Sequence, residues 1–213
     1  MTQLLHLDAS PRGSRSHSRA LSAEVVAALT AVEPTSVVYR DLGHGGLPFI
    51  DEAWIAAAFS DPATHSPELQ DAIRLSDELV DELLAADVVV IGTPMYNFGV
   101  PAVLKAYIDQ IVRVGRTFSG EYQGLAVGKK VYVVSARGAS GYRAGEAMAA
   151  MDYEAAYLHA VFGLIGITDV TVVDIENATG NEATVQASLA DARRRIAELV
   201  ATEQVEVEEL IAA

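Results

Sequence analysis

Three short segments of the chain carry residue types suited to ligand binding, and each follows an apolar run of strand length. The first, residues 8–18, is rich in serine and arginine and leads into a stretch with helical periodicity. Hydroxyls and free backbone amides at a helix start favour phosphate, because the helix dipole is positive there. The segment has neither the G-x-x-x-x-G-K-[ST] nor the G-x-G-x-x-G pattern, so it predicts a site for a phosphate monoester rather than a pyrophosphate. Simple helix capping by Ser16 or Ser18 is the alternative interpretation.

The second segment, residues 92–101, combines two prolines, two glycines, an asparagine, a methionine and two aromatic residues. A structural turn requires Gly, Pro or Asn, but it has no reason to expose Met95, Tyr96 and Phe98 to solvent. A flat apolar ligand would stack on these side chains, and its polar edges would bond to backbone amides of the constrained loop. The alternative is an aromatic cluster packed beneath a neighbouring loop.

The third segment, residues 135–142, consists mostly of small residues around Arg137. Small residues allow the backbone to approach a ligand closely, and Arg137 adds positive charge. Taken alone, this segment favours an ordinary flexible surface loop. Together, the three segments supply a phosphate pocket, an aromatic platform and a loop of small residues, which describes a site for flavin mononucleotide (FMN).

No catalytic acid–base pair is evident, and flavin chemistry does not need one, because the hydride is carried by the isoalloxazine ring. His6 falls inside a predicted strand, while His44, His65 and His159 have no evident carboxylate partner, so structural or solvated roles are favoured for all four. The chain has no cysteine, which excludes disulfides, thiolate zinc sites, iron–sulfur clusters and cysteine nucleophiles. We therefore expect neither a catalytic side chain nor a metal site.

Strand-length apolar runs alternate with segments of helical period along the whole chain. Residues 88–91 and 131–134 are continuously apolar, as expected for parallel strands buried on both faces. The predicted strands are Leu4–Asp8, Ser36–Asp41, Asp87–Thr93, Lys130–Ser135 and Asp169–Ile175. Helices are predicted around residues 21–29, 73–84 and 100–111, and over Ala149–Leu164 and Ala183–Val200.

This alternation predicts an α/β fold with a doubly wound, five-stranded parallel sheet and right-handed crossovers. We expect the flavodoxin-like strand order 2-1-3-4-5, in which ligands bind beyond the carboxyl ends of the strands near the switch point. Because there is no internal repeat or linker, residues 1–213 are expected to form one domain. Within it, Gly43–Pro67 is expected to leave the second crossover as an excursion, and the acidic tail Thr202–Glu209 to be a solvated helix end.

Charge and hydropathy exclude several functional classes. Lys and Arg total 15 against 29 Asp and Glu, a formal net charge of -14, and no basic face offsets it, so nucleic-acid binding is not expected. No apolar run is long enough to span a bilayer, and the start of the chain has no basic region followed by a cleavable apolar stretch. We expect a soluble cytoplasmic protein that does not associate with membranes.

Taken together, these residues resemble the bacterial FMN-dependent NADH:quinone oxidoreductases, also called azoreductases. The resemblance covers nearly the whole chain, and its specific part is a Met-Tyr-Asn-Phe block followed by a helix ending at Thr117-Phe118. It is carried by Ser10-Pro11-Arg12, Ser16-His17-Ser18, Pro94-Met95-Tyr96-Asn97-Phe98, Pro101, Leu104-Lys105, Asp109, Gly115-Arg116-Thr117-Phe118 and Phe162-Gly163-Leu164-Ile165-Gly166-Ile167.

The resemblance implies a flavodoxin-like fold and a homodimer with one FMN per subunit near the interface. It implies that Phe162 reaches the flavin face of the neighbouring subunit, in the substrate pocket. Where family members carry Ser-Arg-Gly-Gly after the fourth strand, this chain has Ala136-Arg137-Gly138-Ala139. The implied cofactor ligands are Ser10, Ser16, His17 and Ser18 for the phosphate and ribityl end, Met95, Tyr96, Asn97 and Phe98 for the ring, and Ala136, Arg137, Gly138 and Ala139.

The leading hypothesis is a ping-pong oxidoreductase, in which NADH or NADPH gives a hydride to the flavin and a quinone or aromatic azo compound then takes both electrons. Arg137 and backbone amides would favour the negative charge of the reduced ring. The alternative is a flavodoxin-type FMN electron carrier, whose acidic surface would dock on a basic redox partner. A third interpretation is a scaffold of this fold that binds no flavin.

Overall fold

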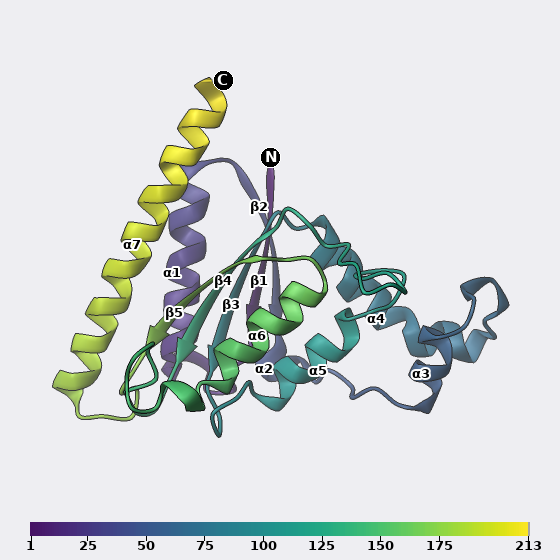
Figure 1. Cartoon of the computed structure of the whole chain (residues 1–213), viewed down its shortest axis with the longest axis horizontal. Coiled ribbons are helices and arrows are strands. Elements are labelled where there is room, and N and C mark those ends of the chain that lie inside the picture. The colour runs from purple at the N-terminus through teal and green to yellow at the C-terminus, as the bar shows by residue number, and fades with distance from the viewer. Residues whose placement is uncertain (213) are drawn as a thin grey trace.

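Five parallel strands form a single sheet in the order β2-β1-β3-β4-β5 (Figure 1). The computed structural model describes residues 1–212, with side chains as far as Val205. The strands are β1 (Thr2–Asp8), β2 (Thr35–Asp41), β3 (Val88–Pro94), β4 (Lys130–Ala136) and β5 (Asp169–Ile175). Both the predicted fold class and the predicted strand order are confirmed, and the predicted strand limits differ from these by at most two residues.

Helices cover both faces of the sheet, and the alternation of side chains along each strand supplies both cores. In β1, Leu4 packs with one core while Leu5 and Leu7 pack with the other. Figure 1 shows α1 and α7 together on one side of the sheet and α4, α5 and α6 on the other. The helices are α1 (His17–Val32), α2 (Leu42–Gly45), α3 (Glu52–Ala58), α4 (Pro67–Ala85), α5 (Ala102–Ile111), α6 (Tyr153–Leu164) and α7 (Glu182–Ala212).

The single helix predicted over Ala149–Leu164 is wrong. A 3₁₀ turn, Ala149–Met151, comes first, and α6 begins only at Tyr153. The break lies at Asp152, whose ψ of 70° is not helical and whose carboxylate accepts a hydrogen bond of 3.0 Å from the Ala155 amide. Asp152 therefore caps a new helix instead of continuing an old one.

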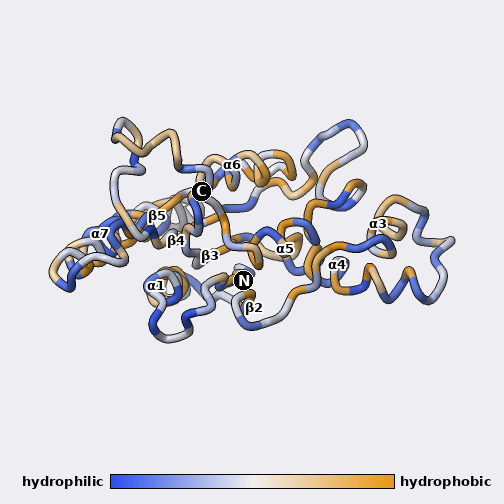
Figure 2. Tube along the Cα trace, turned by 90° about the horizontal axis from the view of Figure 1, so that it is seen from below, coloured by the Kyte–Doolittle hydropathy of each residue, from blue (hydrophilic) through white to orange (hydrophobic). Residues whose placement is uncertain are grey.

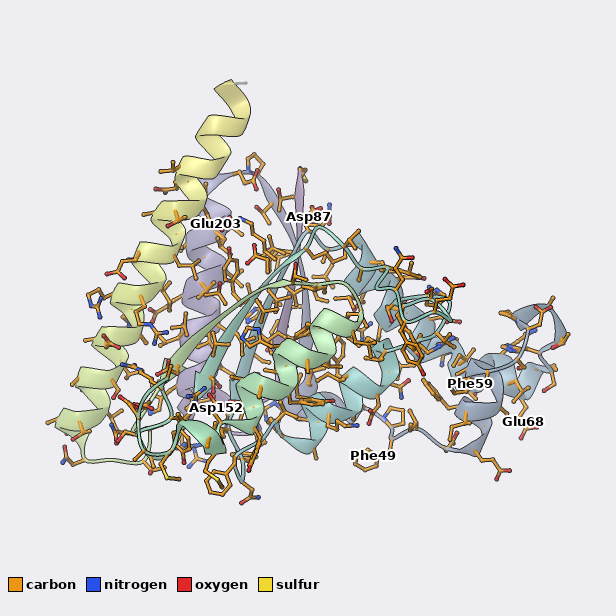
Figure 3. The ribbon with its side chains drawn as sticks, viewed as in Figure 1. Phe49, Phe59, Glu68, Asp87, Asp152 and Glu203 are labelled. Carbon is orange, nitrogen blue, oxygen red and sulfur yellow. The ribbon has the colours of Figure 1, made fainter. Side chains whose placement is uncertain are left out.

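The predicted excursion is present between β2 and α4 and carries α3, which extends away from the sheet at the right of Figures 1 and 2. Trp54 anchors α3, because its indole Nε1 donates a 2.7 Å hydrogen bond to Gln110 of α5. Phe49 and Phe59, labelled in Figure 3, remain 74% and 75% exposed. The excursion thus presents large apolar side chains to its surroundings.

The acidic tail continues α7, as predicted, although Glu203 at its start is not simply solvated. The carboxylate of Glu203 accepts hydrogen bonds from the Lys130 ammonium, at 2.8 and 2.9 Å, and from the Tyr132 hydroxyl, at 2.5 Å. The surroundings of residues 206–209 lie outside the described side chains. Within residues 1–212, no helix has the length and apolar character needed to span a membrane.

Candidate functional site

The segments that follow β1, β3 and β4 begin side by side at the carboxyl edge of the sheet, the edge that Figure 2 views from below. The Ala9 amide donates a 2.8 Å hydrogen bond to the Gly92 carbonyl, which joins the end of β1 to β3. The Met95 amide donates to the Ala136 carbonyl at 2.9 Å, which joins the end of β3 to β4. The three segments singled out in the sequence are therefore neighbours in space.

The first of these segments turns tightly into the start of α1. Gly13 has a φ of 56°, which favours glycine, and a 3₁₀ turn over Gly13–Arg15 leads to Ser16. Ser16 is the N-cap of α1, since its hydroxyl accepts from the Arg19 amide at 3.3 Å, and it lies 3.1 Å from the Ser18 hydroxyl. The capping interpretation is therefore correct for Ser16. It leaves the amides of His17 and Ser18 without an acceptor in the described part of the chain, as expected for a first helical turn.

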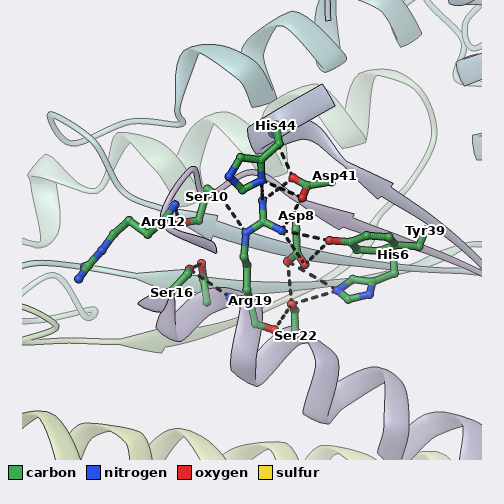
Figure 4. Close-up of polar contacts among 11 residues, drawn as sticks. His6, Asp8, Ser10, Arg12, Ser16, Arg19, Ser22, Tyr39, Asp41 and His44 are labelled. Carbon is green, nitrogen blue, oxygen red and sulfur yellow. Dashed lines mark hydrogen bonds and ion pairs between the residues drawn. The ribbon is translucent and has the colours of Figure 1, made fainter. Parts of the chain in front are cut away.

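Arg19 connects this segment to neighbouring elements through a network of polar contacts (Figure 4). Its Nε donates a 2.7 Å hydrogen bond to the Ser10 carbonyl, and its guanidinium bonds both carboxylate oxygens of Asp41 and, at 3.0 Å, the Tyr39 hydroxyl. Burial opposes the charge of Asp41, yet hydrogen bonds from Arg19 and His44 lower the pKa of its carboxyl to about 2. The network ties the first segment to β2.

Asp8, the last residue of β1, belongs to the same network of polar contacts. It accepts hydrogen bonds from Ser22 at 2.9 Å and from Tyr39 at 3.2 Å, and it lies 3.7 Å from the Arg19 guanidinium. The expectation that His44 has no carboxylate partner is wrong, and His6, expected inside a strand, also lies near a carboxylate. His44 Nδ1 is 2.9 Å from Asp41, and His6 Nε2 is 3.6 Å from Asp8. The His44–Asp41 pairing spans the turn from β2 into α2, whereas His6 and Asp8 lie two residues apart on one face of β1.

The Met-Tyr-Asn-Phe segment is a two-residue hairpin. The Tyr96 amide donates to the Gly99 carbonyl at 3.0 Å and the Gly99 amide donates back at 3.1 Å. Asn97 and Phe98 lie between them with φ values of 51° and 71°, the left-handed region in which an aromatic residue is strained. Tyr96 and Phe98 are exposed at the site, and the Phe98 ring lies 6.5 Å from that of Tyr142. They are not packed beneath the excursion, so that alternative is wrong.

We expect Phe98→Gly to give a higher free energy of unfolding than Phe98→Ala, by about 1 kcal/mol, because glycine adopts positive φ without the steric cost that alanine retains. Urea unfolding of the two variants measures this difference. Leu125 is an exposed loop residue whose φ is not positive, and it serves as the matched control. There the order should reverse, since Leu125→Gly only adds backbone freedom. The same order at both positions would contradict strain at Phe98.

Arg137 does not present free charge to the site. Its side chain is 2% exposed and its guanidinium forms a 2.7 Å ion pair with Asp152, so the suggestion that it supplies positive charge to a flavin is wrong. The guanidinium also lies 5.7 Å from the centre of the Tyr142 ring. Beyond it, the amides of Gly141 and Tyr142 donate to Glu176 at 3.1 and 3.0 Å. The loop after β4 is therefore held by side chains rather than freely flexible.

Phe162 cannot serve as the sequence comparison implied. Its side chain is 1% exposed within this subunit and packs in the core formed by α4, α5, α6 and one face of the sheet. A ring enclosed in its own core is not available to a neighbouring flavin, so this expectation is wrong. Tyr153, which is 56% exposed at the start of α6, lines instead an open pocket of about 490 Å³. The pocket is lined by Gly99, Val100, Ala102, Lys105, Tyr153 and Tyr157.

Glu154 is a buried residue of the site that no sequence pattern indicated. Its carboxylate is buried between the ends of β3 and β4 and accepts hydrogen bonds from the hydroxyls of Thr93, at 3.2 Å, and Ser135. Burial raises the pKa of the Glu154 carboxyl to about 7, although the two hydroxyls and the nearby charge of Arg137 lower it. An acidic residue in the first turn of a helix is ordinary, and no local pattern indicates that this one faces inward.

Comparison with known proteins agrees with this arrangement. A family model described as "Flavodoxin-like fold" matches residues 2–200. An FMN-dependent NADH:quinone oxidoreductase from Nostoc punctiforme is 51% identical to the chain over 205 residues, which cover 94% of this chain and 99% of that protein. The chain belongs to the family of FMN-dependent NADH:quinone oxidoreductases. A second relative, FMN-dependent NADH:quinone oxidoreductase 2 of Trichormus variabilis, is 52% identical over 94% of this chain and 99% of its own length.

The solved structures extend the likeness to the fold. The crystal structure of an azoreductase from Bacillus anthracis superimposes with a TM-score of 0.82 at 26% identity, covering 94% of this chain and 99% of that one. The resemblance stated from the sequence is therefore confirmed, and the relatives favour an oxidoreductase over a plain flavodoxin-type carrier.

Proposed function

We propose that this protein is an FMN-dependent oxidoreductase that takes electrons from NADH or NADPH and reduces quinones and aromatic azo compounds. The observation that carries the proposal is the meeting of the serine-rich segment, the Met-Tyr-Asn-Phe hairpin and the loop after β4 at one edge of the sheet. Relatives with half of their residues identical are named for this activity on quinones.

The serine-rich segment fits a phosphate monoester in its donor chemistry. The hydroxyls of Ser16 and Ser18 lie 3.1 Å apart at the start of α1, beside the amides of His17 and Ser18, which have no acceptor among the described residues. Residues 9–18 contain no acidic side chain to repel a dianion. We assign Ser10, Ser16, His17 and Ser18 to the phosphate and ribityl end, where the helix dipole adds to their hydrogen bonds.

The hairpin fits the ring. Tyr96 and Phe98 expose aromatic and apolar surface there, and Met95, which precedes them, is half-buried. We assign Met95, Tyr96, Asn97 and Phe98 to one edge of the isoalloxazine ring and the backbone of Ala136, Arg137, Gly138 and Ala139 to another. Because both loops are joined by the hydrogen bond between Met95 and Ala136, the two edges are held at a fixed separation.

The chain's own contribution is binding and orientation. When bound, FMN supplies the hydride chemistry that links the nicotinamide to the quinone. The exposed rings of Tyr96 and Phe98 exclude water from one side of the site, and the amides of the loops hold the polar edge of the ring in place. No side chain needs to act as a general acid or base for this transfer.

The proposal includes a homodimer in the cytoplasm, where the nicotinamide donor is available. Support for a dimer comes from exposed apolar surface on the excursion and in the open pocket beside the hairpin. Phe49 and Phe59 of the excursion are mostly exposed, and Tyr153 and Tyr157 line the open pocket beside the hairpin. A second subunit seated on this surface would bury these side chains and close the substrate side of the site.

Reconstitution with FMN tests the function. The protein incubated with FMN should turn yellow, bleach on anaerobic addition of NADH or NADPH, and regain its colour with a benzoquinone. A carrier of single electrons would not be bleached by a nicotinamide, and a protein that stays colourless would refute the proposal.

Replacing both Ser16 and Ser18 with alanine should raise the FMN dissociation constant at least about tenfold, because each hydrogen bond to a charged group contributes about 1.5–3 kcal/mol. Quenching of FMN fluorescence measures this constant. Ser14→Ala, which changes an exposed serine of the same segment, is the matched control and should leave it unchanged. Because Ser16 also caps α1, circular dichroism of the apoprotein must show that the helix content is kept.

A further inference from the structure

Glu154 occupies a position that connects the two loops assigned to the flavin ring. Its carboxylate lies between Thr93, next to the last residue of β3, and Ser135, next to the last residue of β4. One carboxylate oxygen accepts from each hydroxyl, so a single side chain of α6 joins both strand ends directly below the loops. At 1% exposed, it is among the most deeply buried charged residues described.

The carboxylate has no direct cationic partner. Among the described residues, no lysine, arginine or histidine nitrogen lies within ion-pair distance of Glu154. Arg137 is linked to Glu154 indirectly, because its Nε lies 3.4 Å from the hydroxyl of Ser135. The Nη2 atom of Arg137 is bonded to Asp152. A buried carboxylate held by hydroxyls alone is poorly compensated, so the neutral form is within reach near neutral pH.

Other charged groups around this end of α6 are already compensated. β3 and β4 contribute only the two hydroxyls. At the end of β5, Asp174 is paired with Arg143 and Arg195, and Glu176 accepts from two backbone amides. Asp152 raises and Arg137 lowers the pKa of the Glu154 carboxyl, and burial exceeds both in bringing it to about 7.

The hydrogen bonds can be satisfied in either protonation state. Thr93 Oγ1 lies 3.2 Å from the Glu154 carboxylate and 3.4 Å from the Pro94 carbonyl. When Glu154 is ionised, the Thr93 hydroxyl donates to it. When Glu154 is protonated, it donates to Thr93 Oγ1, and the Thr93 hydrogen turns to the Pro94 carbonyl, which directly precedes Met95. A protonation change therefore costs no buried hydrogen bond.

We propose that Glu154 is a positioning residue that takes up a proton from solvent when the bound FMN is reduced. This inference rests on the proposed function. In the reduction, a C–H bond of the nicotinamide breaks, the hydrogen passes to the flavin with its electron pair, and the nicotinamide is oxidised. Hydride uptake would add one negative charge to a flavin held by the loops above Glu154, and that charge would favour the neutral form of the Glu154 carboxyl. A water-derived proton then forms the O–H bond of the carboxyl.

The test counts protons instead of turnover. Hydride transfer from NADH consumes no solvent proton, so alkalinisation of a weakly buffered anaerobic solution, read with an indicator dye, reports proton uptake either by the protein or by the reduced ring, and a Glu154 variant separates the two. FMN-loaded wild type mixed with one equivalent of NADH should take up protons, approaching about one per FMN between about pH 7 and pH 8. Glu154→Gln keeps the shape and an acceptor oxygen but cannot take up the proton, and it should lose this uptake. Glu68→Gln, which changes an exposed carboxyl at the start of α4 (Figure 3), should keep it.

The outcomes separate this inference from the function on which it rests. If NADH does not bleach the bound FMN, the proposed function fails and the inference fails with it. If bleaching is normal and Glu154→Gln takes up as many protons as wild type, the inference alone is overturned. Should Glu154→Gln not fold, Thr93→Val decides, with Thr93→Ser as its control. Loss of the hydroxyl disfavours the carboxylate, so the uptake should move to higher pH in Thr93→Val only, and an unmoved uptake range overturns the inference.

Discussion

Replacing Arg19 with alanine is expected to lower the free energy of unfolding by about 3 kcal/mol, the lower end of the range for breaking a buried ion pair. The Arg19 side chain is 12% exposed, and its loss leaves Asp8 without its cation and Asp41 without its bidentate partner. The Asp41 side chain is 31% exposed, so water partly solvates its charge and reduces the loss of stability. Urea unfolding of the apoprotein measures the change.

The same substitution should also weaken FMN binding, because the Ser10 carbonyl loses the donor that fixes the serine-rich segment. Arg12 provides the control, since it is an exposed arginine of that segment whose side chain points away from the network in Figure 4. Arg12→Ala should change the unfolding free energy by less than about 0.5 kcal/mol. Arg19→Lys should lie between the two, because an ammonium cannot bond both oxygens of Asp41 in the way that a guanidinium does. Equal stabilities for Arg19→Ala and Arg12→Ala would contradict a stabilising role for the network.

This network also marks where interpretation of the sequence reached its limit. Strands and strand order followed from apolar periodicity, because a buried parallel strand has few alternatives, and the three site segments followed from the strand order. The pairing of Arg19 with Asp41 joins α1 to the far end of β2, and the pairing of His44 with Asp41 depends on a turn. Neither ion pair produces a repeating pattern of residue types, so neither can be recognised in the sequence.

Side-chain direction was the second limit. Phe162 and Glu154 both belong to α6. The role of Phe162 was predicted wrongly and Glu154 was overlooked, because α6 is apolar on nearly every side. A helix with a weak polar face gives little indication of which side chains enter the core. The structure shows that the phenylalanine is enclosed in its own subunit and that the glutamate faces the strand ends. Arg137 illustrates the same limit, since only the structure brings it to Asp152 and cancels its charge.

A methyl group added at Gly92 is expected to disrupt the contact between β1, β3 and α1 at the site. An alanine Cβ there would lie 2.3 Å from the Asp8 carboxylate, 2.7 Å from the Ser22 hydroxyl and 3.1 Å from the Ser18 carbonyl. Asp8 cannot move aside freely, because hydrogen bonds from Ser22 and Tyr39 hold it. Overpacking of this kind costs about 1–3 kcal/mol in a close-packed interior, and here it also pushes against the start of α1.

Gly92→Ala should therefore lower both the unfolding free energy and the affinity for FMN, since relief of the clash moves the phosphate-binding end of α1 away from β3. Gly99→Ala, in the connection between β3 and α5, is the control. Nothing lies within 4 Å of an added Cβ at Gly99, and its φ is not positive, so its unfolding and FMN affinity should match those of wild type. If Gly92→Ala loses stability but keeps its FMN affinity, α1 and β3 can separate without disturbing the cofactor. The serine-rich segment would then not depend on the contact between β1, β3 and α1 for its position.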